Sequence, residues 1–148
     1  MLIKTNGGFL MGKIRQIGGR VFERLLAEYG VDQFNGPQGR ILYVLWENDN
    51  IPISALSEKT GLAKTTLTSM LDRMEASGQV QRVCDPADRR KINIRLMESI
   101  KGLRASYDEV SDRMSKIFYE GFTDDEIIAF EKQLTRILKN LERKEDIK

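Results

Sequence analysis

The segment 54–96 constrains the fold of this chain most, because two helical patterns are followed directly by two short alternating runs. Ser54 can cap a short helix, and a glycine turn at residues 60–62 leads to a second helix over 64–77. β-branched residues then recur at every second position in 80–84 and 92–96, as in half-buried strands. This order predicts a mainly α fold with a small β-wing (α+β), a winged helix-turn-helix.

The loop between the two expected strands, Asp85–Lys91, is long for a tight hairpin. Its second half carries three successive cations, Arg89, Arg90 and Lys91. Cations at a hairpin tip repel one another unless something anionic lies opposite them. A phosphate backbone is the obvious anion, and its narrow minor groove can accept an inserted arginine. The wing therefore predicts double-stranded DNA as a partner.

The charge of the chain is unevenly distributed. The formal net charge is only +2, but residues 63–96 hold seven cations against four anions. The other residues hold 17 cations and 18 anions. The basic character is thus concentrated where groove-facing elements are expected.

Several absences narrow the function. The chain has no His and one Cys, which removes the usual general base, an intrachain disulfide and a cysteine zinc site. It shows no phosphate-binding or dinucleotide fingerprint and no stretch near the ~20 apolar residues of a membrane span. We therefore expect a cytoplasmic protein that is not an enzyme and needs no cofactor or metal.

The runs Ala55–Thr68 and Leu71–Gly78 resemble the MarR family of winged-helix transcription regulators, and Asp88 and Arg90 match that family's Asp-x-Arg wing signature. The resemblance is specific over 53–96 and diffuse elsewhere. It implies a homodimer with a recognition helix in each of two adjacent major grooves and wing arginines in the minor grooves. It also implies regulation by a small ligand or oxidant, so we expect a dimeric regulator, most simply a repressor, that reads a pseudopalindromic operator.

The resemblance also assigns DNA-binding residues. On the recognition helix they are Lys64, Thr65, Thr66, Thr68, Ser69 and Arg73, and on the wing they are Asp88, Arg89, Arg90 and Lys91. Arg90 falls at the minor-groove tip, where Asp88 can orient it through a charge-assisted hydrogen bond. Arg73 falls where relatives place a phosphate-contacting or wing-bracing arginine. The expected buried face of this helix comprises Leu67, Met70, Leu71 and Met74.

Two departures from the family pattern keep an alternative open. Ala63 stands where many relatives have a Ser or Thr cap, which costs the helix roughly 1 kcal/mol. Ser69 replaces a frequent longer polar or basic residue. With the near-neutral net charge, these suggest a winged-helix protein-interaction module with weak or lost DNA binding as the alternative.

The flanking segments predict dimerisation. We expect a division into an N-terminal dimerisation helix (1–34), a DNA-binding region (35–97) and C-terminal dimerisation helices (98–148). The first helix carries five glycines within or just before it, so packing must hold it or it must begin late. A heptad seam is formed by Ile100, Leu103, Tyr107, Val110, Met114 and Ile117. An intrachain helix pair remains the alternative use of this seam.

Other local signals are weaker. Asn35-Gly36-Pro37, with Asn as cap and Pro in the first turn, opens a helix that should run to about Glu47, and a short strand is expected over 51–53. Thr123 begins a capping box. Cys84 is best interpreted as a small apolar strand residue, with a redox role as the alternative. A pocket for an aromatic or anionic effector is expected near Arg15, Arg40, Tyr43 and Trp46.

Overall fold

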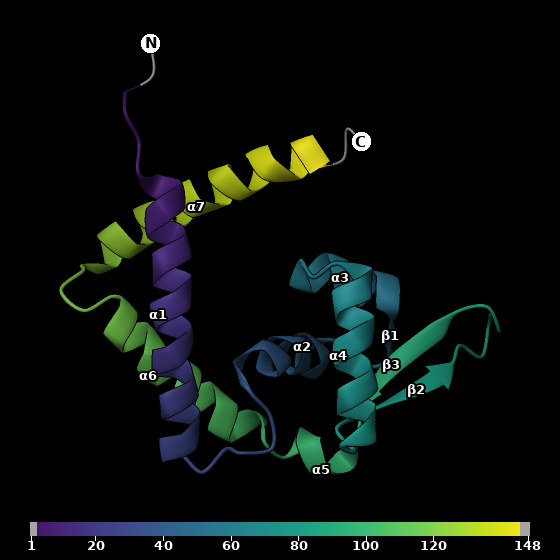
Figure 1. Cartoon of the computed structure of the whole chain (residues 1–148). Helices are drawn as coiled ribbons and strands as arrows, with labels where there is room; N and C mark the ends of the chain where they lie inside the picture. Colours follow the sequence, from purple (N-terminus) through teal and green to yellow (C-terminus); the bar gives the residue numbers. More distant parts are fainter. Residues whose placement is uncertain (1–2, 146–148) are drawn as a thin grey trace. The chain divides into compact units, whose positions relative to one another are not determined.

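The computed structural model describes residues 3–145, and its contacts divide the chain into two units that meet at Asp112 and Arg113. The helices of the first unit are α1 (Gly7–Glu28), α2 (Gly36–Glu47), α3 (Ile53–Thr60), α4 (Lys64–Ala76) and α5 (Glu98–Lys101) (Figure 1). The strands are β1 (Ile51–Pro52), β2 (Val80–Cys84) and β3 (Ile92–Leu96). Helix α6 (Arg104–Phe118) runs into the second unit, which also holds α7 (Asp124–Glu145).

The three strands form one antiparallel sheet in the order β1-β3-β2. β2 and β3 pair along their whole lengths, from Val80 opposite Leu96 to Cys84 opposite Ile92. They form the hairpin that extends beyond α4 in Figure 1. The bounds of both wing strands agree with the prediction, and the winged-helix fold is confirmed.

The helix-turn-helix forms much as the sequence predicts. Leu67, Leu71 and Met74 have no exposed surface, and they hold α4 against the core. Met70, expected on the same face, is only half-buried. The predicted cap of α3 was wrong: the helix begins at Ile53, before Ser54, because the N-cap position is taken by Pro52. Proline has its φ fixed near the value found there, −64°.

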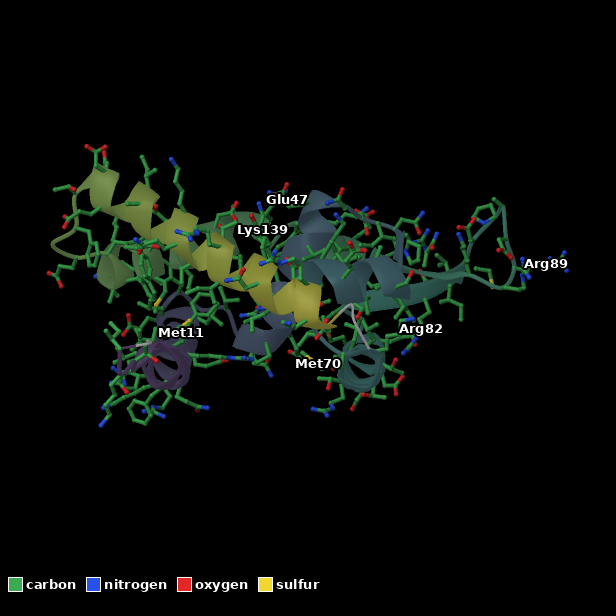
Figure 2. The ribbon with its side chains drawn as sticks, turned by 90° about the horizontal axis from the view of Figure 1, so that it is seen from above. Met11, Glu47, Met70, Arg82, Arg89 and Lys139 are labelled. Carbon is green, nitrogen blue, oxygen red and sulfur yellow. The ribbon has the colours of Figure 1, made fainter. Side chains whose placement is uncertain are left out.

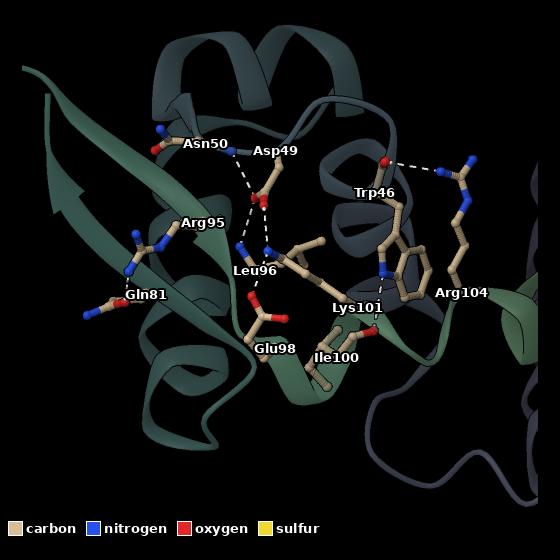
Figure 3. Close-up of polar contacts among 10 residues, drawn as sticks. All are labelled: Trp46, Asp49, Asn50, Gln81, Arg95, Leu96, Glu98, Ile100, Lys101 and Arg104. Carbon is tan, nitrogen blue, oxygen red and sulfur yellow. Dashed lines mark hydrogen bonds and ion pairs between the residues drawn. The ribbon is translucent and has the colours of Figure 1, made fainter.

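Side-chain to backbone hydrogen bonds join α2 and the loop that follows it to β3, α5 and the start of α6 (Figure 3). A carboxylate oxygen of Asp49 accepts a hydrogen bond from the backbone N–H of Leu96 at 2.8 Å. The indole Nε1 of Trp46 donates to the carbonyl oxygen of Ile100 at 3.2 Å, and Arg104 donates to the carbonyl oxygen of Trp46 at 3.1 Å. The end of the wing is thereby fixed to the body of the first unit.

Three of the six residues of the expected heptad seam are buried within the chain, and its last residue is exposed. Ile100, Tyr107 and Val110 are buried within the chain itself, where the ring centroid of Tyr107 lies 5.2 Å from that of Trp46. Ile117 remains 46% exposed. For these three residues the intrachain alternative holds, because aromatic side chains that precede them in the chain cover Tyr107.

The second unit contains a helical hairpin, in which a capping box begins α7 and a side-chain hydrogen bond joins Tyr119 to that helix. The predicted capping box is confirmed, since Thr123 N–H donates to Glu126 and Glu126 N–H donates to the Thr123 hydroxyl. The hydroxyl of Tyr119 donates to a carboxylate oxygen of Glu131 at 2.7 Å. This bond raises the pKa of Tyr119 to about 12.

Helices α1 and α7 each expose several large apolar side chains. On α1 these are Phe9, Leu10, Met11, Ile14 and Ile17, and on α7 they are Ile128, Ile137, Leu138 and Leu141. α1 begins early, at Gly7, although its glycines weaken it and nothing in the described chain buries its first half. No helix within residues 3–145 has the length and apolar character needed to cross a membrane.

Candidate nucleic-acid interface

The outward face of α4 carries the predicted recognition residues. All six of them are exposed: Lys64, Thr65, Thr66, Thr68, Ser69 and Arg73. They surround the buried stripe of the same helix, so short polar and cationic side chains face solvent while the apolar ones hold the helix down. As expected, Ala63 provides no side-chain cap, and it contributes only its carbonyl oxygen to the first helical hydrogen bond. Contact of these six residues with DNA stays a prediction.

The wing tip has a fixed internal structure. Asp88 accepts hydrogen bonds from the backbone N–H of Arg90 at 3.0 Å and from its Nε at 3.3 Å, so the predicted orienting bond is confirmed. The backbone bond and then the side-chain bond lower the pKa of Asp88. Asp85 accepts from the N–H of Ala87, and its own N–H donates to the carbonyl oxygen of Lys91. The Arg90 side chain remains 91% exposed and is free to meet a partner.

Arg82 is a site residue that the sequence reasoning missed. It lies on β2 at the base of the wing, whereas Arg89 lies at the tip (Figure 2). Its Nη1 contacts Glu75 and its Nη2 contacts Asp72, both at 2.8 Å. The backbone N–H of Arg82 also donates to Glu75 at 3.0 Å, and these hydrogen bonds lower the pKa of Glu75. Two carboxylates three residues apart on the recognition helix, followed by a strand arginine, were the available signal.

Arg73 does not brace the wing. Its Nη2 donates to the hydroxyl of Ser69 at 3.3 Å, one turn earlier on the same helix. Of the two arginines, Arg82 and not Arg73 joins β2 to α4, since its side chain contacts Asp72 and Glu75. A phosphate contact by Arg73 stays a prediction.

Cys84 is the last residue of β2, as its interpretation as a strand residue predicted, and its side chain is exposed. The strand ends there and leaves little structure to cover the thiol. A redox role stays open, and no second cysteine exists in the chain.

The structure brings only part of the expected effector set together. Arg15 and Arg40 are exposed on different helices, while Tyr43 and Trp46 pack beside the ring of Tyr107. A shallow hollow of about 420 Å³ does lie beside the end of α1, but none of the four residues lines it. Its lining residues are Glu23, Leu26, Ala27, Val31, Asp32, Gln33, Phe34, Asn35 and Gln38. An effector site near the four expected residues stays a prediction.

Comparison with known proteins identifies the family. The MarR family profile matches residues 34–92. The uncharacterized HTH-type transcriptional regulator YsmB of Bacillus subtilis is 38% identical over 110 residues, which are 73% of this chain and 74% of that protein. The chain belongs to the MarR family. A MarR protein from Peptoclostridium difficile has the same fold, with a TM-score of 0.84 at 24% identity over 97% of this chain and 94% of that one. Reduced AbfR bound to DNA matches with a TM-score of 0.71 at 26% identity, covering 90% of each chain.

Proposed function

We propose that this MarR-family protein is a dimeric transcription regulator that binds pseudopalindromic duplex DNA in the cytoplasm. It would regulate transcription by occupying its DNA site, without catalysing a reaction. The recognition helix α4 would enter the major groove and Arg90 the adjacent minor groove. The observation that carries this proposal is the exposed polar face of α4 next to a wing whose Arg90 is already oriented by Asp88. The related AbfR and MarR proteins, whose structures contain DNA, support the same use of the fold.

The exposed faces of α1 and α7 support the dimer. A weakly helical, glycine-containing α1 with five large apolar side chains in solvent needs a covering surface from outside its own chain. A second copy of the chain supplies that surface, and we propose the segments 1–34 and 98–148 as its source, with 35–97 as the DNA-binding region. Twofold symmetry then places two α4 helices about one DNA turn, ~34 Å, apart.

Selection of duplexes from a random-sequence library tests the proposal. We expect the protein to select a bipartite, twofold-symmetric site and to lose affinity steeply with salt. The variant Arg90→Ala should weaken binding by ~1–3 kcal/mol without changing the dimer. Lys139→Ala, which removes an equal charge from an exposed position on α7, is the control.

Three results would count against this function. An affinity for duplex DNA that stays weak at low salt, with a salt slope near zero, would favour the protein-interaction module instead. An unchanged affinity of Arg90→Ala would remove the wing from the mechanism. A monomer at micromolar concentration in sedimentation would remove the dimer.

A further inference from the structure

The side chain of Arg82 turns back from the wing toward α4. Its side chain is 21% exposed, in contrast to 91% for Arg90. We propose that Arg82 is a positioning residue for DNA binding: it clamps the base of the wing to the recognition helix, so that Arg90 and α4 meet DNA as one rigid unit. This inference rests on the proposed function, and it assigns Arg82 no contact with DNA.

The contacts of Arg82 all fall on one stripe of the helix. Its partners are the carbonyl oxygen of Thr68 at 3.4 Å and the carboxylates of Asp72 and Glu75. These positions are separated by four and three residues, so they share one face of α4. The two terminal nitrogens hold different carboxylates, which requires the planar fork of arginine and not the single ammonium of lysine. The backbone N–H adds a further bond to Glu75, so the helix holds the strand itself as well as the side chain.

The wing needs such a contact because little else supports it. β1 pairs only with Asn93 and Ile94, so the outer part of the hairpin is a two-stranded ribbon. A two-stranded ribbon is marginally stable by itself, and its direction is set by the contacts at its base. A wing that is already oriented avoids the ordering cost of binding, which is about 0.5–1.5 kcal/mol for each long side chain immobilised.

Simple electrostatics predicts the opposite effect for the two carboxylates. Asp72 and Glu75 are 66% and 39% exposed on the helix that carries the predicted DNA-reading residues. Negative charges there oppose the approach of phosphates, so removing both should strengthen binding if charge alone mattered. If they anchor Arg82, removing them releases the wing and should weaken binding although the net charge rises by two.

Because the two models predict opposite changes in DNA affinity, measuring that affinity tests the proposal. The measurement uses the full chain and the duplex that the wild type selects from a random library. We expect the double variant Asp72→Asn/Glu75→Gln to bind about 5-fold or more weakly, and Arg82→Gln about 5- to 20-fold more weakly with an unchanged salt slope. Arg82→Lys should not restore affinity, since it keeps the charge but loses the fork. Lys139→Gln, which removes an equal charge from an exposed position on α7, is the control and should leave affinity unchanged. Thermal unfolding of each variant separates loss of folding from loss of positioning.

A double-mutant cycle with Arg90 supplies a readout that a merely structural arginine would not move. In an Arg90→Ala background, Arg82→Gln should cost less than about 2-fold, because the arginine proposed to enter the minor groove is no longer there to be positioned. Additive losses, a salt slope reduced by about 0.9, or tighter binding by the carboxylate double variant would each overturn the clamp. If the wild type selects no sequence, the proposed function fails. If Arg90→Ala weakens binding and Arg82→Gln does not, only the clamp fails.

Discussion

Replacing Gly39 with alanine tests the packing that joins α2 to the start of α6. A Cβ added at Gly39 would lie 2.7 Å from Cε2 of Tyr107 and 3.4 Å from Cε2 of Phe34. Carbon atoms make favourable contact at about 3.5–4.0 Å, so the Tyr107 ring would have to move. It has little room to do so, since the ring centroids of Phe22, Phe34 and Trp46 lie 5.8, 5.9 and 5.2 Å away.

Two opposing free-energy terms decide the outcome. Alanine stabilises a helix interior over glycine by about 0.8–1.0 kcal/mol. Overpacking a filled core costs about 1–3 kcal/mol, and an overlap with a wedged aromatic ring belongs in the upper part of that range. We therefore expect Gly39→Ala to lower the free energy of unfolding by about 1–2 kcal/mol. At about 2–4 °C for each kcal/mol in a chain of this size, the melting temperature should fall by about 2–8 °C.

Urea unfolding followed by circular dichroism measures this change. Gly102→Ala is the control, because its φ of −74° suits any residue and no atom lies within 4 Å of the added Cβ. It should leave stability unchanged or slightly raised. In a Tyr107→Leu background the cost of Gly39→Ala should shrink, since the overlapping ring atom is gone. A Gly39→Ala protein as stable as the wild type would refute the reasoning.

Two further substitutions test local bonds. Asn35→Ala removes the side-chain oxygen that accepts from the N–H of Gln38 at 2.8 Å, and it should lower the free energy of unfolding by about 1 kcal/mol in urea titration; no change would show that water replaces the cap. Glu131→Gln removes the carboxylate whose hydrogen bond raises the pKa of Tyr119, so ultraviolet titration should show this pKa falling from about 12 toward its ordinary value of 10.0. Because the folded pKa is raised, the stability linked to this bond is complete below pH 10 and is lost as pH rises through about 12.

The elements with strong local signals were predicted well. The alternation of β-branched residues predicted the bounds of both wing strands, and Asn35 with Pro37 predicted the start of α2 at Gly36. Which chain covers the seam at Tyr107 could not be predicted, because spacing by three and four residues shows that a helix has an apolar face, but not whether its own chain or another covers it. The aromatic side chains that cover Tyr107 come from helices tens of residues earlier in the sequence.

In the candidate site, too, contacts between residues close in sequence were predicted and contacts between distant elements were missed. The bond between Asp88 and Arg90 was predicted because its partners are two residues apart, and local geometry brings them together. The contacts of Arg82 were missed because its partners lie 7 and 10 residues away on another element. Which strand side chain faces which turn of α4 depends on how the β2–β3 hairpin packs against that helix. The local residue pattern does not determine this packing.

Trp46 gives this protein a built-in optical reporter. It is the one tryptophan in the chain, and its indole N–H is bonded to the carbonyl oxygen of Ile100 beside the ring of Tyr107. Indole emission responds to hydrogen bonding and to the polarity of its surroundings. An event that pulls α5 away from α2, whether caused by DNA or by a small molecule, would therefore shift the fluorescence of the unlabelled protein.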